Sequence, residues 1–311
     1  VVSDESLAVV DMAAETLLPE MVTIAEDLLN PPIAEEVVLS PDGSYAFVRQ
    51  FGETTVALVD LFSHEVSRIE AGGNPTDLDL TPDGTAAVIV ARDTRELWIY
   101  DAVDPYTTPQ VVDTPNSLVV GSIQFDPTGT RAALYSTAAN EAIYASWDLN
   151  SNEIQVRPLE KPIDSVSIAP SGETMLIFHG NDNASGANSA SPFYNEYAMT
   201  MIDLVDFRST AVLMDADSNG YAHSSNGNFG FFIMEDEPYL IMLDYASLLP
   251  YPYELKSNPV FVGVLPDLDV SDADEPPTWV SQEHDLGRIS FFDPDDESLE
   301  TITGFELNSE I

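Results

Sequence analysis

The tetrapeptide "SPDG" at Ser40–Gly43 lies between two apolar runs, "EEVVL" at 35–39 and "YAFV" at 45–48. Similar tetrapeptides recur as "TPDG" at 81–84, "DPTG" at 126–129 and "APSG" at 169–172. Their prolines are 41, 45 and 43 residues apart. Proline presets φ at the second position of a turn, and glycine supplies a positive φ. Each tetrapeptide therefore predicts a tight turn between two strands, and the spacing predicts a repeated unit.

A second marker keeps step with the turns, an apolar stretch that ends in aspartate. It occurs seven times, at Asp11, Asp60, Asp101, Asp148, Asp203, Asp244 and Asp293. Each unit then has one strand before the turn, one after it, one that ends in the aspartate and one beyond. Repeats of about 40 to 45 residues with four strands each are typical of a β-propeller. We therefore predict an all-β, seven-bladed β-propeller of four-stranded antiparallel blades.

The two ends of the chain are expected to close the ring. The first aspartate marker has only ten residues before it, and the C-terminal "ITGFELNSEI" stops where another turn should begin. We predict one domain over 1–311, with the seventh blade shared between about 1–25 and 304–311. Such sharing removes the open sheet edges that would otherwise pair with other chains.

The stretch "IEAGGNPTDLDLTPDGTAAVIV" at Ile69–Val90 resembles a repeat of the YVTN family of seven-bladed propellers. The resemblance extends over most of the chain at the level of the repeats. It implies an exported protein, at the cell surface, in the periplasm or outside the cell, because the family occurs in surface-layer and exported proteins. The chain begins at Val1, so we also expect a processed or trimmed N-terminus.

The chain is strongly acidic, with 54 Asp and Glu against 10 Lys and Arg and a net charge of −44. Binding to nucleic acid and to anionic membranes depends on Lys and Arg, so neither is expected. No apolar run approaches the roughly 20 residues of a membrane helix, so direct insertion is not expected either. Three interpretations of the acidity stay open: solubility in high salt, a surface that gathers divalent cations, or attraction of a basic partner.

One unit carries a long insertion, "GNDNASGANSASPFYNEY" at 180–197. It falls between the second and third strands of the fourth blade, on the side where chain segments pass from blade to blade. Two interpretations stay open. The insertion is either a plain surface loop or a binding lid in which Phe193, Tyr194 and Tyr197 are aromatic contacts.

The stretch "DADSNG" at Asp215–Gly220 resembles the start of a calcium loop. Asp215, Asp217 and Asn219 alternate as oxygen ligands do in such loops. The twelfth position is Asn226 instead of a bidentate Glu, so any affinity for Ca²⁺ is expected to be low. Asp182 and Glu196 of the insertion are the candidates to complete the shell. The alternative is a connection that only makes a turn.

Residues for catalysis are scarce, and none is predicted. The chain has no cysteine, no pair of histidines at metal-ligand spacing and no GxSxG motif. The sequence therefore favours a non-enzymatic binding module or scaffold in an envelope assembly, with a protein or envelope component, including a basic one, as partner. The alternative is a metal-dependent hydrolase, similar to the lactonases of this architecture, with carboxylates at the central channel.

Overall fold

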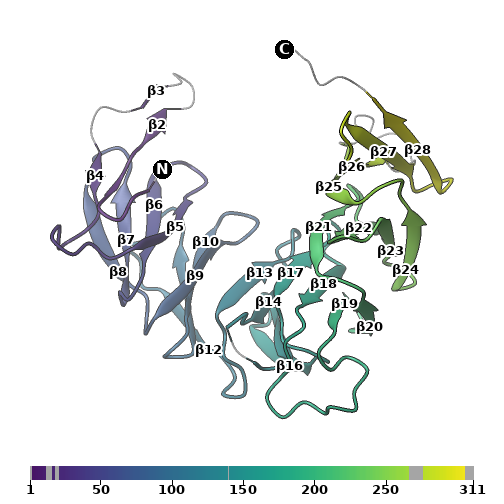
Figure 1. The fold of residues 1–311 in the computed structure, drawn as a ribbon. Coiled ribbons are helices and arrows are strands. Elements are labelled where there is room, and N and C mark those ends of the chain that lie inside the picture. The colour runs from purple at the N-terminus through teal and green to yellow at the C-terminus, as the bar shows by residue number, and fades with distance from the viewer. Residues whose placement is uncertain (1, 12–15, 18–20, 139, 266–275, 305–311) are drawn as a thin grey trace. The chain divides into compact units, whose positions relative to one another are not determined.

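The computed structural model describes residues 2–11, 16–17, 21–138, 140–265 and 276–304. All regular structure in these residues is β-strand (Figure 1). They contain no helix long and apolar enough to cross a membrane. Six four-stranded antiparallel sheets follow one another along the chain, and in each the strands pair in sequence order.

We number these sheets blade 1 to blade 6. Blade 1 is β5 (Ala34–Leu39), β6 (Tyr45–Gln50), β7 (Thr55–Asp60) and β8 (Val66–Glu70). Blade 2 is β9 (Pro75–Leu80), β10 (Ala86–Ala91), β11 (Glu96–Asp101) and β12 (Gln110–Asp113). Blade 3 is β13 (Ser122–Phe125), β14 (Arg131–Tyr135), β15 (Ile143–Asp148) and β16 (Glu153–Pro158).

The other three blades have the same order. Blade 4 is β17 (Ser165–Ile168), β18 (Thr174–His179), β19 (Tyr197–Asp203) and β20 (Ser209–Met214). Blade 5 is β21 (Ser218–His223), β22 (Phe229–Met234), β23 (Tyr239–Asp244) and β24 (Leu249–Glu254). Blade 6 is β25 (Pro259–Val264), β26 (Thr278–Gln282), β27 (Arg288–Asp293) and β28 (Ser298–Thr303). The sequence had placed all four strands of blade 1 correctly.

The N-terminal segment forms two short sheets. β1 (Ser6–Leu7) pairs with β4 (Val22–Thr23), and β2 (Val10–Asp11) pairs with β3 (Thr16–Leu17). Leu7, Val22 and Ile24 are buried against Val48 and Val59 of blade 1, as a neighbouring blade would be. The architecture is thus the predicted seven-bladed propeller, with six complete blades and, at the N-terminus, short strands of a seventh. Residues 305–311, predicted to complete that blade, lie outside the described residues, so ring closure stays a prediction.

The chain divides into two compact units. One contains the N-terminal strands and blades 1 to 3, apart from the short stretches Asp126–Thr128 and Asn140–Ala142. The other contains those two stretches and Leu159–Ile311, which includes blades 4 to 6. Within each unit, the first strands of neighbouring blades lie against each other, as in the pairs β5 and β9, β9 and β13, and β21 and β25.

The apolar residues explain why the sheets stack. The second and third strands of a blade are buried almost throughout, whereas the fourth strands are largely exposed. Side chains from two successive blades share each core. Phe47 and Leu58 of blade 1 pack with Leu78 and Ile89 of blade 2, and Phe231 of blade 5 packs with Phe292 of blade 6. A single sheet that is apolar on both faces needs a neighbour on each side to keep these residues from water.

Six of the aspartate markers, from Asp60 to Asp293, end the third strands of blades 1 to 6, as predicted, and they stabilise the next turn. The seventh, Asp11, ends β2 in a two-stranded sheet. The Asp60 carboxylate accepts the backbone N–H groups of Phe62 and Ser63 at 2.9 and 2.8 Å. Asp101 accepts those of Val103 and Asp104 at 2.8 and 2.9 Å. These backbone donors lower the pKa of Asp60 and of Asp101, because they stabilise the charged form. The repeated aspartate is therefore structural.

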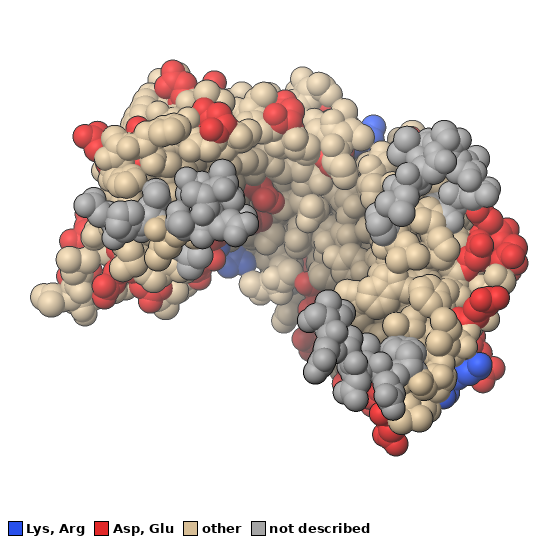
Figure 2. Space-filling model, turned by 90° about the horizontal axis from the view of Figure 1, so that it is seen from above, with Lys and Arg blue, Asp and Glu red and all other residues tan. Residues whose placement is uncertain are grey.

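Acidic side chains are spread over the surface (Figure 2), as the composition implied. On the face shown, few Lys and Arg lie among them.

The turn glycines have positive φ, and neighbouring turns contact each other. Gly43 and Gly84 have φ of 70° and 69°. A Cβ atom on Gly84 would lie 2.3 Å from Cγ of Pro41 in the turn of the preceding blade, whereas a Cβ on Gly43 would meet nothing within 4 Å. The turn of blade 2 therefore packs closely on that of blade 1.

This difference gives a matched pair of variants. Gly43→Ala should cost about 1 kcal/mol of unfolding free energy, from backbone strain alone. Gly84→Ala should cost a further ~1–3 kcal/mol, because the new methyl group displaces Pro41. Denaturant unfolding of both variants measures the difference. Equal losses would contradict the turn-on-turn contact.

Candidate functional site

The Gly180 to Tyr197 insertion is a loop of several turns between β18 and β19, and a buried lysine holds it. Lys161 lies in the link between blades 3 and 4 and is only 1% exposed. Its Nζ donates a hydrogen bond to the backbone carbonyl of Phe193 at 3.1 Å. Burial lowers the pKa of Lys161, while the nearby carboxylates of Asp182 and Glu196 act in the opposite direction. The lysine thus ties the insertion to the blade below it.

Hydrogen bonds within the insertion fix its shape. Asn183 and Asn195 pair twice, Asn183 Nδ2 to Asn195 Oδ1 at 2.6 Å and the backbone N–H of Asn195 to Asn183 Oδ1 at 2.9 Å. The N–H of Ser185 donates to the carbonyl of Asn140, in the loop between β14 and β15, at 2.9 Å. The insertion is therefore held to the fold near its start by Asn140 and near its end by Lys161, and the Asn183–Asn195 pair joins these two parts.

The anchored loop borders an open pocket of about 250 Å³. The walls come from the insertion, from Glu160 beside the buried lysine and from Ala142. Of the predicted aromatic contacts, Phe193 and Tyr194 line the pocket, and Tyr194 is 36% exposed. Tyr197 does not line it. It begins β19 and packs, half-buried, against the core shared by blades 4 and 5.

The residues predicted to bind calcium are exposed, and they are not gathered into one shell. Asp215 and Asp217 precede β21, and Asn219 lies within it, where the register with β22 shifts. Asp182 and Glu196 lie near Lys161 instead. Among the described residues, no three His, Cys, Asp or Glu side chains are placed to hold a metal ion. Calcium binding at this loop stays a prediction.

Two histidines make hydrogen bonds through both ring nitrogens. His179, 2% exposed, donates from Nδ1 to the carbonyl of Pro162 at 2.7 Å, so its Nε2 accepts from Thr200 Oγ1 at 2.8 Å. Burial lowers its pKa to about 4, so the ring is neutral near pH 7. His179 is a core histidine that supports the base of the insertion.

His223 connects blades 4 and 5 through a series of hydrogen bonds that runs from Ser167 to His223 and on to Tyr245. Its Nε2 lies 2.7 Å from Ser167 Oγ and its Nδ1 lies 2.6 Å from Tyr245 Oη. Within the described residues, the buried Tyr245 hydroxyl has no other acceptor, so it donates to Nδ1. The ring proton is then on Nε2 and points at Ser167. This arrangement does not activate the serine, which needs an unprotonated nitrogen beside it.

Carboxylates on the first strands join blades 1, 2 and 3. Asp77 Oδ2 accepts the backbone N–H of Ile123, on the first strand of the next blade, at 2.7 Å. At the equivalent position one blade earlier, Glu36 accepts a hydrogen bond from Arg49 Nε at 3.0 Å, and Arg49 also pairs with Glu35. Burial raises the pKa of Glu36 and of Asp77, and their hydrogen bonds oppose the rise.

Asp79 lies beside these two carboxylates and has no hydrogen-bond donor among the described residues. Its burial, together with the charges of Asp77 and Glu36, raises its pKa to about 7. The sequence carries one signal for this group. The stretch "TDLDL" at 76–80 places Asp79 where the first strands of blades 1, 3, 4 and 5 carry Val38, Gln124, Ser167 and Ala222.

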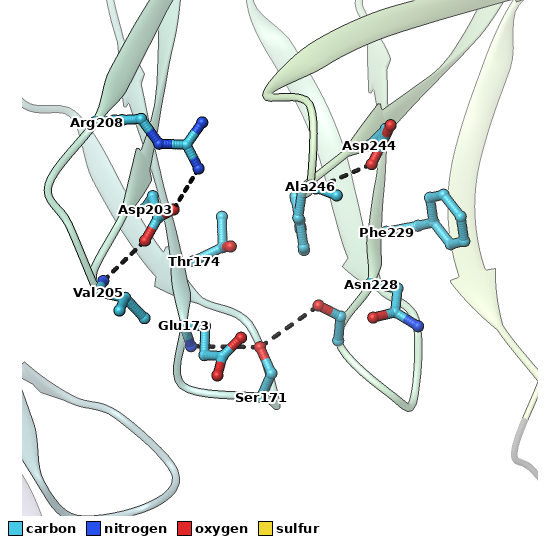
Figure 3. Close-up of a pocket in the computed structure, with 12 residues that line it drawn as sticks. Ser171, Glu173, Thr174, Asp203, Val205, Arg208, Asn228, Phe229, Asp244 and Ala246 are labelled. Atoms are coloured by element: carbon cyan, nitrogen blue, oxygen red, sulfur yellow. Dashed lines mark hydrogen bonds and ion pairs between the residues drawn. The ribbon is translucent and has the colours of Figure 1, made fainter.

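A larger pocket, of about 340 Å³, lies between blades 4 and 5 on the side of the turns (Figure 3). Asp203, Arg208 and Asp244, three of its charged groups, already have partners. Asp203 pairs with Arg208 at 2.7 Å and accepts the N–H of Val205 at 2.8 Å, and Asp244 accepts that of Ala246 at 2.9 Å. A hollow of about 270 Å³ occurs at the equivalent place between blades 2 and 3. We therefore interpret both as hollows that result from blade stacking.

Comparison with known proteins supports the fold. No family model matches the chain, and no curated protein sequence matches it. Among solved structures, hydrazine synthase of Kuenenia stuttgartiensis is 14% identical with a TM-score of 0.54, over 96% of this chain and 89% of that one. The dihydro-heme d1 dehydrogenase NirN, in complex with DHE, is 12% identical with a TM-score of 0.59, over 98% of this chain and 63% of that one.

Both of these structures are β-propeller proteins. At such low identity they show the fold alone. The resemblance to the YVTN family stays an interpretation of the repeats.

The raised pKa of Asp79 predicts a pH dependence of stability. Its pKa is about 7 in the folded chain and about 3.9 when unfolded, so the folded state holds the proton more tightly between these values. This contribution to stability is present at low pH and is lost as the pH rises through 7.

Asp79→Asn should therefore stabilise the fold at pH 8, by on the order of 1 to 2 kcal/mol after allowance for solvent screening, and should do so far less at pH 4. Unfolding measurements at both pH values test this. Glu65→Gln, at an exposed carboxylate, is the control. A gain that is equal at the two pH values would show that Asp79 does not titrate as described.

Proposed function

We propose that the chain is a non-enzymatic, exported propeller that binds its partner at the Gly180 to Tyr197 insertion and serves as a binding module or scaffold in a cell-envelope assembly. The observation that carries the proposal is the anchored loop itself. A surface loop without a function would not require a buried lysine to hold it. In this insertion, the buried Lys161 donates a hydrogen bond to the backbone carbonyl of Phe193. Ordering a loop in advance lowers the entropy cost of binding.

The position of the loop also supports binding. In an antiparallel blade, the link between the second and third strands lies at the same end as the passage to the next blade. Residues from three such links meet here: the insertion, Glu160 between blades 3 and 4, and Ala142 between β14 and β15. Loops held by a rigid scaffold are the common place for ligand contacts.

The acidity favours a neutral or basic partner in this proposal, since the net charge of −44 repels anions. Export is proposed together with the envelope role. It draws on the sequence resemblance.

A loop replacement tests the function. Residues 181–196 are replaced by the four-residue link Phe51–Thr54 that joins β6 to β7 in blade 1. Lys161→Met is added because the ammonium group would otherwise be left buried without its acceptor. We expect a folded protein, by circular dichroism and melting temperature, that no longer co-sediments with the insoluble envelope fraction of the producing cells. Lys161→Met alone is the control for the lysine. Co-sedimentation equal to that of the wild type would contradict the proposal.

A metal-dependent hydrolase is the second candidate, and the first-strand carboxylates favour it. Glu36, Asp77 and Asp79 lie within electrostatic reach of one another, and Asp79 has no hydrogen-bond donor among the described residues, but the three are not placed to share a metal ion in this structure. Elemental analysis of the purified protein tests this: one divalent metal per chain, lost in Asp79→Asn, would support the hydrolase, and no metal would dismiss it. The same analysis on Asp215→Ala with Asp217→Ala covers the predicted calcium loop.

A further inference from the structure

The pocket under the insertion offers polar groups with hydrogen-bonding capacity that the described residues leave unused. The Asn188 amide uses its Oδ1 to accept from the N–H of Ala190 at 3.0 Å, which leaves its Nδ2 to donate. Ser191 Oγ accepts from the N–H of Phe193 at 3.3 Å, and its own hydrogen is free. The Glu160 carboxylate, which only accepts, lines the same pocket. The pocket therefore offers both donors and acceptors to a ligand.

The charge of the pocket excludes an anionic ligand. Its lining contains one carboxylate, Glu160, and no Lys, Arg or His. The nearest cation, Lys161, is buried, donates to Phe193 and lies near Asp182 and Glu196. No positive group therefore faces the ligand, and a carboxylate or phosphate would be repelled.

Apolar and small residues form most of the remaining wall, beside Asn183 and Ser185. Phe193 and Tyr194 contribute aromatic rings, and Ala142, Ala184 and Ala187 leave room close to the backbone. The volume of about 250 Å³ is a little below the usual range of ligand pockets, which starts at about 300 Å³. The space thus suits one compact ring with an apolar face that can lie against an aromatic side chain.

We propose that this pocket binds a single residue of an uncharged carbohydrate. Sugar hydroxyl groups both donate and accept hydrogen bonds, so they can bond to the Asn188 amide, the Ser191 hydroxyl and the Glu160 carboxylate. The C–H face of the sugar ring then lies against the Tyr194 ring. The inference rests on the proposed binding function of the loop and names its ligand class. It also explains how so acidic a protein can be held at an envelope, because a neutral glycan is not repelled.

The test is a small panel of ligands on the intact protein. Methyl glycosides of glucose, galactose, mannose and N-acetylglucosamine are measured by saturation-transfer NMR and calorimetry, next to glucuronate as an anionic analogue and N-acetyl-Ala-Ala-amide as a neutral peptide. We expect at least one neutral glycoside to bind, at least tenfold more tightly than glucuronate. Binding of the peptide without any glycoside would overturn the inference, as would glucuronate binding as tightly as the neutral sugars.

Variants locate the site. Tyr194→Ala should weaken glycoside binding at least tenfold, and Asn188→Ala several-fold. Glu160→Gln should reduce the difference in affinity between glucuronate and the neutral sugars, because it removes the negative charge that repels glucuronate. Tyr106→Ala, at a tyrosine that is 60% exposed in the other unit, is the matched control and should change nothing. Glycoside binding that is unaffected by Tyr194→Ala would place the site elsewhere and contradict the inference.

The result is separable from that of the loop replacement. If no glycoside binds but the loop-replaced protein still loses its envelope co-sedimentation, the binding function stands and the carbohydrate inference falls. If glycosides compete with the envelope fraction for the wild-type protein, both stand.

Discussion

A sheet that is apolar on both faces cannot remain alone in water, and this constraint shapes most of the chain. The middle strands of every blade are buried, so each blade has to lie between two neighbours. Repeating one unit along the chain satisfies this need, and it also fixes where polar groups are allowed: at the turns, along the outer strands and at the ends of the first strands. Chemistry is confined to those places.

The contacts between blades combine apolar packing with a few directed polar bonds. Phe47 and Leu78 pack across the contact of blades 1 and 2, and Asp77 accepts the amide of Ile123 across that of blades 2 and 3. The bond from Asp77 fixes the relative position of two first strands, which apolar packing alone leaves free to slide. The carboxylates involved are buried in part, which raises the pKa of Glu36, Asp77 and Asp79. Asp79, with no donor of its own, is the group that this arrangement leaves available.

The sequence predicted the blades well, because their signals are local. A turn such as Ser40–Gly43 and a strand-end residue such as Asp60 act within a few residues of themselves, and the structure gives both the expected hydrogen bonds. The insertion was also placed correctly by counting. Lys161 could not be found in this way, because its partner Phe193 is 32 residues further along the chain. Nor could counting show that Asp182 and Glu196 lie near Lys161, since that depends on the path of the loop.

We infer that the insertion is already formed before anything binds. Residue-resolved hydrogen exchange of the unliganded protein measures this. The amides of Ser185 and Asn195 donate hydrogen bonds, whereas those of Asn181 and Ser189 have no acceptor among the described residues. The account predicts that the first pair exchanges at least about tenfold more slowly than the second, and that Lys161→Met removes the protection at Asn195. Exchange of all four amides at the rate of an unfolded peptide would contradict it.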